Sequence, residues 1–421
     1  MTTKQLPHSF QFFLPCAAGT EPFLEQEIAA IAPNVQRTIK PGGVAVRGGW
    51  DLCMQLNLQS RIAVRVLLQV AHASYLIEQD IYQLALKTKW ENWFTPNQTF
   101  KINATARKSP LHSLNFAALR VKDGIVDRFR EQTEIRPNVD TKQPDVQIQI
   151  HFDERMATFY IDTSGEPLFK RGWRQIQGEA PLKETLAAAM IAASGWDYKA
   201  GQPFLDPCCG SGTIPIEAAQ IACGIPAGLH RRFAFEKLKL HQPAAWQQIK
   251  QKAKDQIHAP TAPVFGSDVS FRMVDFAKQN AKRAGVLHAV EFHGGDALER
   301  PAPAPKGMMV INPPYGERIN PQGSLGKNTK SNTWRSPESQ TDTTEDFFPR
   351  LASHWKQAFD GWTAWVLTPD MKLSQLMRLK ESRRTPLWNG PIECRFMRFD
   401  IVAGSARRIP QSDKAPDNSH H

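Results

Sequence analysis

The fold of this chain is decided by residues 203–223, which read PFLDPCCGSGTIPIEAAQIAC. The first three residues predict a short apolar strand that ends at Asp206, and the apolar segment from Ile214 onward predicts a helix. Between them, Gly210 and Gly212 allow a tight turn in which helix N–H groups face a ligand. The turn is not a P-loop, because the Gly-Lys-Ser/Thr ending is missing. Several nucleotide-binding folds have such a turn, and a purely structural turn is an equal alternative.

Three more apolar strands follow at intervals, with amphipathic segments between them, and this alternation predicts a parallel α/β sheet. The four expected strands cover residues 203–205, 264–266, 290–292 and 308–311. Ligands bind at the carboxyl ends of strands in such sheets, so the polar residues that follow these strands should converge. They are Asp206, Asp268, Asp296 and Asn312. Asp268 suits ribose hydroxyls and Asp296 an adenine amino group, although a lone strand-end Asp is usually a cap or turn residue.

The motif Asn312-Pro313-Pro314-Tyr315 directly follows the last of these strands. Two prolines fix the backbone so that one carbonyl points outward without a ladder partner. The Asn312 side-chain oxygen and the Pro313 carbonyl can then accept both protons of a planar exocyclic amino group. Tyr315 offers a flat face on which an extruded base can stack. With the glycine turn upstream, this order favours a methyl-transfer site over the alternative, a rigid Pro-Pro loop.

The chain ahead of this region shows two smaller patterns. Residues 1–65 combine a helix expected over 21–31 with a strand around 44–46, which fits a small α+β unit. Residues 66–174 contain a helix expected over 115–130, with an apolar stripe of Leu119, Val121, Ile125, Val126 and Phe129. Two alternating strands, 146–152 and 157–161, follow it as a hairpin joined at 153–155.

The C-terminal part returns to a folded pattern after an interruption. Residues 320–344 are nearly devoid of aliphatic side chains and rich in Ser, Thr, Asn and Gly, which predicts a flexible insertion. Helix and strand patterns resume over 345–403, including a strand over 362–367. Residues 409–421 predict a disordered tail.

The formal net charge of +11 and a pI near 9.4 favour a polyanionic partner. Basic residues concentrate in residues 371–408, which hold nine Lys or Arg against three acidic residues, although a solvated basic face is the plain alternative. For each candidate RNA-contact residue, the alternative is a solvated surface charge without a binding role. The candidates are Arg107, Lys108, Lys122, Arg136 and Arg318.

The six cysteines show no paired metal-ligand spacing, and the adjacent Cys208 and Cys209 are poorly placed for an ordinary disulfide. This indicates a reducing compartment. The N-terminus lacks a secretory signal pattern, and the most apolar helix candidate, residues 186–193, is too short to span a bilayer. We therefore expect a cytoplasmic protein with neither a metal nor a membrane partner.

Three segments together resemble the THUMP-domain class I RNA methyltransferases, in particular those that methylate guanine N2 in 23S ribosomal RNA. They are residues 180–186 (APLKETL), 206–213 (DPCCGSGT) and 312–318 (NPPYGER), with further similarity at 136–140 and 227–231. The resemblance runs through nearly the whole chain. It implies a ferredoxin-like domain over 1–65, an RNA-binding THUMP domain over 66–175 and a Rossmann-like methyltransferase domain over 176–408.

The resemblance also implies S-adenosylmethionine as the cofactor. Its methionine part would lie against Asp206, Pro207, Gly210, Gly212 and Thr213. Pro181, Leu182 and Lys183 would close over the same end, Asp268 would hold the ribose, and Asp296 with Ala297 the adenine. Some members carry a second, fused catalytic domain. This sequence shows a single methyltransferase domain, so we expect the second activity to be absent. The insertion at 320–344 departs from the family pattern beside the target-base motif.

The implied reaction is an in-line attack of guanine N2 on the sulfonium methyl group. Positioning should carry most of the catalysis, and no strong general base is needed, since the nitrogen can lose its proton after attack. The expected partner is 23S rRNA or a ribosomal precursor. The alternatives are a tRNA guanine, a DNA adenine N6, a protein glutamine, or a non-catalytic RNA-binding assembly factor. The sequence leaves the target guanine and the oligomeric state open.

Overall fold

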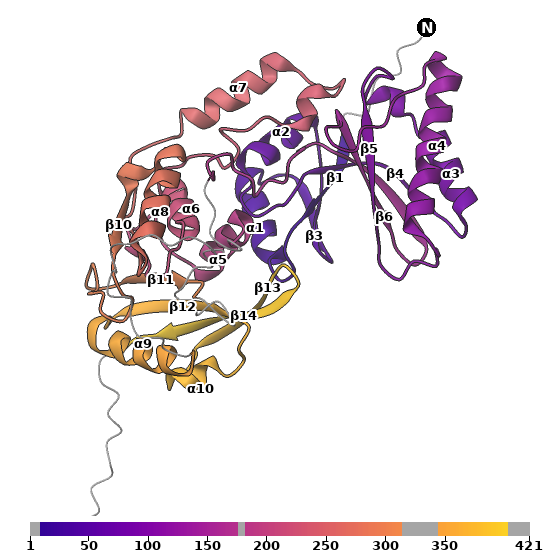
Figure 1. The fold of residues 1–421 in the computed structure, drawn as a ribbon. Helices are drawn as coiled ribbons and strands as arrows, with labels where there is room; N and C mark the ends of the chain where they lie inside the picture. Colours follow the sequence, from indigo (N-terminus) through magenta and orange to yellow (C-terminus); the bar gives the residue numbers. More distant parts are fainter. Residues whose placement is uncertain (1–8, 176–181, 314–343, 403–421) are drawn as a thin grey trace, which may run out of the picture.

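The computed structural model describes residues 9–175, 182–313 and 344–402. Within them the strands form two seven-stranded sheets, which Figure 1 shows side by side. The first sheet is built from the part of the chain before residue 163, and the second from the part after residue 203. The two sheets divide the described chain into an N-terminal and a C-terminal half.

The first sheet has the strand order β2-β3-β1-β4-β7-β6-β5 and is antiparallel except for the parallel pair β5–β6. Alternate residues of β6 are buried, as the period-two pattern predicts. Because β1 pairs with β4, the segments 1–65 and 66–174 contribute to one continuous sheet. The strands are β1 (Phe10–Pro15), β2 (Gln36–Lys40), β3 (Gly43–Gly48), β4 (Leu67–Ser74), β5 (Phe100–Ala106), β6 (Val146–Phe152) and β7 (Met156–Asp162).

The second sheet has the order β10-β9-β8-β11-β12-β14-β13. The first five strands in this order are parallel, and β14 and β13 add an antiparallel edge. The expected parallel strands are confirmed, whereas the antiparallel edge was not predicted. The strands are β8 (Phe204–Asp206), β9 (Val264–Asp268), β10 (Val290–Gly294), β11 (Gly307–Ile311), β12 (Trp362–Thr368), β13 (Arg383–Asn389) and β14 (Ile392–Asp400).

Helices cover both faces of the second sheet. In β11, Met308 and Val310 pack toward α5, α6 and α8, while Met309 and Ile311 pack toward α9. A strand buried on both faces is apolar without alternation, which explains the uninterrupted run at 308–311. The helices of this half are α5 (Glu184–Ser194), α6 (Thr213–Ala222), α7 (Pro243–Lys254), α8 (Phe271–Arg283), α9 (Thr344–Ala358) and α10 (Leu373–Met377).

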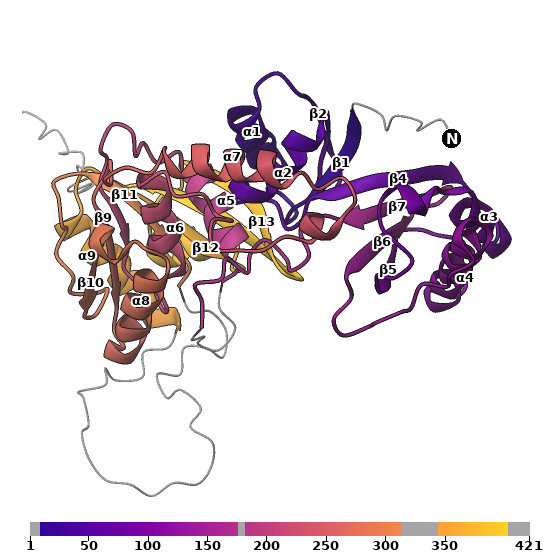
Figure 2. The ribbon, with the colours of Figure 1, turned by 90° about the horizontal axis from the view of Figure 1, so that it is seen from above.

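The N-terminal half has two helix pairs. α3 (Glu78–Lys87) and α4 (Leu114–Thr133) pack together at the end of the molecule remote from the second sheet (Figure 2). α1 (Glu21–Ile31) contacts α5, and α2 (Trp50–Gln59) contacts α7, so this second pair joins the halves. No helix in the described ranges is long and apolar enough to cross a membrane.

The expected helix over 115–130 is present as α4, but one residue of its predicted apolar stripe is misplaced. Leu119 is 51% exposed, whereas Val121, Ile125 and Phe129 are fully buried. The prediction that Leu119 belongs to the buried face is wrong. Leu119 lies on the edge of the helical stripe, and α3 and β5 cover the other side of α4.

A buried ion-pair cluster fixes the junction between the halves. Arg171 and Glu217 have side chains only 1% and 0% exposed, and the Arg171 Nε lies 3.0 Å from Glu217 Oε1. Arg61, just after α2, also pairs with Glu217 at 3.1 Å. Such a pair holds its partners firmly, because separating them leaves a buried charge uncompensated. Helix α6 is thereby tied to the N-terminal half.

Candidate active site

Four strands end at one edge of the second sheet, because β10, β9, β8 and β11 are parallel neighbours in this order. Asp206 ends β8, and Asp268 ends β9. Asp296 follows β10, and the preceding Gly295 donates its N–H to the Asp268 carbonyl at 3.0 Å. Asn312 directly follows β11. The structure therefore brings the four predicted polar positions to the same edge.

The glycine turn between β8 and α6 has the conformation that its sequence suggests. Gly210 and Gly212 have φ values of +52° and +89°, which favour glycine. A Cβ atom on Gly212 would lie 3.0 Å from the Cβ of Ala277 and 3.1 Å from the Cδ1 of Ile216, so the turn packs closely against α8. Helix α6 begins at Thr213, so its free N–H groups face this turn.

Asp268 holds the turn in place across the sheet edge. One carboxylate oxygen accepts the Gly210 N–H at 2.9 Å, and the other accepts the Ser270 N–H at 3.0 Å. Burial raises the pKa of Asp268 above its usual value. Each oxygen still has a lone pair for a further hydrogen bond. The carboxylate is therefore fixed in orientation and able to accept ligand hydroxyl groups.

Asp206 is buried beside it. Its Oδ1 accepts the Cys208 N–H at 3.0 Å. Burial raises the pKa of Asp206 well above its usual value, and the neighbouring Asp268 raises it further. Pro207 is buried at the start of the turn. The two carboxylates disfavour further negative charge directly beside them.

Asp296 has a local structural role in addition to its place at the edge. Its Oδ1 accepts the Leu298 N–H at 2.9 Å, and its carbonyl accepts the N–H groups of Glu299 and Arg300 at 3.1 Å each. One carboxylate oxygen thus caps the turn after β10, which is the usual role of a strand-end Asp. Ala297, the other predicted adenine neighbour, is buried.

The side-chain oxygen of Asn312 is a buried acceptor at this edge of the sheet. This Oδ1 accepts no hydrogen bond from any described residue. A buried acceptor without a donor is unfavourable and calls for an explanation, such as a ligand donor. Pro313 beside it is buried. The predicted partners Pro314 and Tyr315, and the RNA candidate Arg318, lie outside the described residues.

The two cysteines of the turn are expected to be unreactive. Burial raises the pKa of both Cys208 and Cys209 well above the usual value, and the charges of Asp206 and Asp268 raise both further. Both side chains therefore stay protonated thiols, which are poor nucleophiles and poor metal ligands. Over the described ranges, no group of three or more His, Cys, Asp or Glu side chains is arranged to hold a metal ion.

The segment that precedes α5 is partly described. Leu182 is buried in the core of the second half. Lys183 precedes the first turn of α5, and its Nζ lies 5.2 Å from the ring centre of Phe169. The Lys183 ammonium therefore makes a cation–π contact within the protein. Pro181, the third predicted residue of this segment, lies outside the described residues.

An arginine that holds the glycine turn was not predicted from the sequence. The side chain of Arg174 is 8% exposed and pairs through Nε with Glu184 at 2.7 Å. Its two terminal nitrogens donate to the Ser211 Oγ at 2.9 Å and the Thr213 Oγ1 at 2.6 Å. These partners are 10, 37 and 39 residues away in the chain, so no local pattern marks the arginine.

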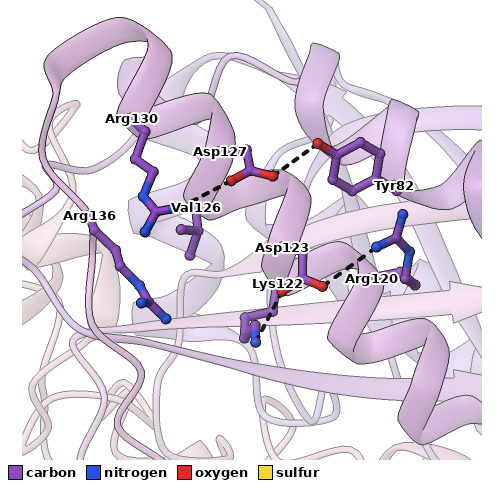
Figure 3. A pocket seen from close by; sticks show the side chains of 8 residues that line it. All are labelled: Tyr82, Arg120, Lys122, Asp123, Val126, Asp127, Arg130 and Arg136. Atoms are coloured by element: carbon purple, nitrogen blue, oxygen red, sulfur yellow. Dashed lines mark hydrogen bonds and ion pairs between the residues drawn. The ribbon is translucent and has the colours of Figure 1, made fainter.

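Two of the predicted RNA-contact residues line a surface cavity of about 420 Å³ on α3 and α4. Figure 3 shows Lys122 and Arg136 among its lining side chains. Arg107 and Lys108 follow β5 and are not part of this lining. Because the cavity is formed entirely by the N-terminal half, it is separate from the strand-end site. The lining residues are Tyr82, Arg120, Lys122, Asp123, Val126, Asp127, Arg130 and Arg136.

Three family descriptions match successive parts of the chain. Residues 11–67 match the RlmL ferredoxin-like domain, residues 77–162 the THUMP domain, and residues 171–336 the RMKL-like methyltransferase domain. The sequence-based expectation of this domain set and of this fold is confirmed. The third match includes both the glycine turn and the segment after β11.

Individual proteins show the same similarity. The ribosomal RNA large subunit methyltransferase K/L of Psychromonas ingrahamii is 36% identical over 397 residues, which cover 93% of this chain and 50% of that protein. Its counterpart in Shewanella baltica OS155 is 35% identical, with 94% and 54% covered. This chain thus spans about half the length of these relatives. The crystal structure of SMU.472 with SAH superposes with a TM-score of 0.81 at 26% identity, covering 95% of this chain and 99% of that one.

Proposed function

Because the chain belongs to the THUMP-domain methyltransferases with an RMKL-like catalytic domain, we propose that it methylates RNA. The methyl group comes from S-adenosylmethionine and goes to the exocyclic N2 of a guanine in 23S ribosomal RNA. The observation that carries this proposal is the buried, unpaired Oδ1 of Asn312 at the edge that also bears the glycine turn. This oxygen can accept a hydrogen bond from a ligand donor such as the amino group of a base.

The described residues fit the cofactor. The glycine turn and the N-terminus of α6 suit its methionine end, with Asp206, Pro207 and Thr213 around it. Asp268 retains lone pairs for the ribose hydroxyls, and the second carboxylate oxygen of Asp296, which accepts no hydrogen bond from a described residue, suits the adenine amino group. Pro181, Leu182, Lys183 and Ala297 complete the proposed set. The SAH in the crystal structure of SMU.472 is consistent with a cofactor of this class.

In the proposed reaction the protein mainly positions the target base. S-Adenosylmethionine supplies a methyl group that is already activated on a sulfonium, so orientation contributes most of the rate. The Asn312 Oδ1 and the Pro313 carbonyl accept the two protons of the guanine amino group and keep its nitrogen lone pair out of the ring. Pro314 and Tyr315 complete the motif, with Tyr315 stacking on the base. The nitrogen loses its proton after attack, so no strong base is required.

The choice of RNA rests on the N-terminal half. The cavity on α3 and α4 has four cationic and two acidic side chains, which favours phosphate. We propose Lys122 and Arg136 as contacts there, with Arg107, Lys108 and Arg318 as further contacts. The same proposal includes domain boundaries at residues 65 and 175, which separate the ferredoxin-like, THUMP and methyltransferase domains. The choice of 23S rRNA follows the names of the relatives, and such a substrate implies a cytoplasmic site of action.

The test of this function is transfer of labelled methyl from S-adenosylmethionine to unmodified 23S rRNA, tRNA and DNA, with nucleoside mass spectrometry of the product. We expect N2-methylguanosine in 23S rRNA alone. Label in tRNA would keep the chemistry and replace the substrate, whereas methyladenine in DNA would contradict the assignment of the base. No label in any nucleic acid, despite SAH binding, would contradict the RNA methyltransferase proposal.

We expect the replacement Arg136→Gln to weaken RNA binding uniformly across sequences. If Arg136 contacts one phosphate, the slope of log K against log salt should become shallower by about 0.7 to 0.9. The measurement is RNA affinity by fluorescence anisotropy over a range of KCl concentrations. The matched control is Lys252→Gln, which removes an exposed charge from α7. An equal slope for Arg136→Gln and wild type would remove this residue from the RNA interface.

SAH affinity should also depend on pH. Burial raises the pKa of both Asp268 and Asp206, so these carboxylates take up protons at a higher pH than exposed ones. Protonation of Asp268 weakens the acceptor proposed for the ribose, and protonation of Asp206 removes a charge beside the methionine end. The SAH dissociation constant measured by calorimetry should therefore increase as the pH falls through these raised pKa values. In Asp268→Asn the dependence should be shallower, and an unchanged profile would contradict the ribose assignment.

A further inference from the structure

The segment between the two halves places a guanidinium directly behind the glycine turn. Arg174 lies ten residues before the start of α5, and its side chain reaches both hydroxyl groups of the turn, on Ser211 and Thr213. Its charge is balanced by Glu184, whose side chain is 5% exposed. The cluster is therefore neutral, and its effect on a ligand must come from the direction of its hydrogen bonds.

Hydrogen-bond direction in this cluster follows from the chemistry of arginine. A guanidinium has only donors, so the Ser211 Oγ and the Thr213 Oγ1 must both act as acceptors toward it. Each hydroxyl then keeps its own proton for donation. Within the described part of the chain, neither proton is donated to another residue. Because Ser211 and Thr213 are only 5% and 6% exposed, water has little access to these two donors.

Two buried hydroxyl protons that no described residue accepts are well suited to an acceptor on the ligand. Both stand at the start of α6, where free backbone N–H groups also favour a negative charge. S-Adenosylmethionine has one anionic group, the carboxylate of its methionine part. A carboxylate accepts several hydrogen bonds at once, so it can take both hydroxyl protons.

We propose that Arg174 is a positioning residue that turns the Ser211 and Thr213 hydroxyls into donors for the cofactor carboxylate. This inference rests on the proposed cofactor, and it assigns roles to Arg174 and Ser211, which lie outside the predicted site. Arg174 acts only through the two hydroxyls and does not touch the cofactor. It should therefore affect binding of the amino-acid end and leave binding of the adenosine end unchanged.

The test compares two ligands that differ in the amino-acid end. SAH carries it, whereas 5′-methylthioadenosine has the same adenosine and thioether without it. The replacement Arg174→Lys keeps a cation for Glu184 but loses the planar fork that reaches both hydroxyls. We expect calorimetry to give about tenfold weaker SAH binding and less than a twofold change for 5′-methylthioadenosine. Equal losses for both ligands, or no loss for either, would overturn the inference.

A second variant is needed because a lysine at position 174 can still donate to one of the two hydroxyls. The double replacement Arg174→Met with Glu184→Gln removes both charges together, so no uncompensated charge is buried. It should reduce SAH affinity at least as much as Arg174→Lys, again with 5′-methylthioadenosine unaffected. Ser211→Ala should weaken the binding of SAH but not of 5′-methylthioadenosine. Its effect and that of Arg174→Lys should together be less than additive, because both changes remove the donation from the same Ser211 hydroxyl. Additive effects would contradict the inference.

The control is Arg65→Lys, which alters another buried ion pair, with Asp162 in the N-terminal half. It should lower the melting temperature without changing the ratio of the two affinities. A changed ratio in this control would mean that general destabilisation explains the result and would overturn the role of Arg174. Wild-type protein that binds neither ligand would contradict the proposed function itself, which separates that failure from failure of this inference.

Discussion

Replacing Asn312 with alanine should reduce turnover by about 100- to 1,000-fold, the effect expected when one preorganised polar group is removed from a reacting centre. The buried Oδ1 of Asn312 accepts no hydrogen bond from a described residue, so its loss leaves no donor of the described structure unpaired. SAH affinity should therefore stay within about twofold of wild type. The measurements are methyl transfer to 23S rRNA under single-turnover conditions and SAH binding by calorimetry.

The replacement Asn312→Asp is the matched comparison. It keeps an oxygen at the same position, so it retains an acceptor for the amino group, although it adds a charge beside other carboxylates. We expect its turnover to lie between those of wild type and Asn312→Ala. Normal turnover in Asn312→Ala, with SAH still bound, would show that another group holds the target base.

Replacing Asp268 with alanine should act on the cofactor instead, with about 100-fold weaker SAH binding. Two effects combine, because the ribose hydroxyls lose a charged acceptor and the Gly210 N–H loses the oxygen that anchors the turn. Asp268→Asn should lose less, since its amide oxygen can still accept one of the two N–H groups. Calorimetry with SAH measures both variants.

The matched control for Asp268→Ala is Asp275→Ala, which removes an exposed carboxylate from α8, the helix that follows β9. Its SAH affinity should equal that of wild type. If Asp268→Ala also binds SAH normally, the ribose does not use this carboxylate. If instead it retains SAH binding but loses turnover, the residue belongs to the target-base side of the site.

The sequence predicted those parts of the fold that depend on local pattern. The strands before Asp206, Asp268 and Asn312 are short apolar runs with polar ends, and such runs indicate strands and their limits directly. The pairing of β1 with β4 depends on residues more than fifty positions apart. No local pattern encodes it, so the sequence alone predicts two separate N-terminal units. Leu119 was misassigned because helical periodicity does not reveal how wide the covering surface is.

The candidate site was predictable to a similar extent. Strand topology alone places Asp206, Asp268, Asp296 and Asn312 together, and the structure does so. Their proposed roles in binding and catalysis stay predictions. Other contacts of the site join residues that are not neighbours in the chain. They are the hydrogen bond from Gly210 to Asp268 and the contacts of Arg174 with Glu184 and the turn. Such contacts follow from packing and could not be predicted from spacing.

For the RNA methyltransferase activity proposed above, the continuous first sheet and the buried Arg61–Arg171–Glu217 cluster would limit which RNAs can be substrates. Since the cavity-bearing end and the strand-end site belong to parts joined by β1–β4 pairing and by a buried ion pair, their separation is set by the fold. An RNA anchored at one end can present only a nucleotide that lies at a matching span from the anchor. The enzyme would then select its guanine as a molecular ruler, by length and shape of the RNA more than by the neighbouring bases.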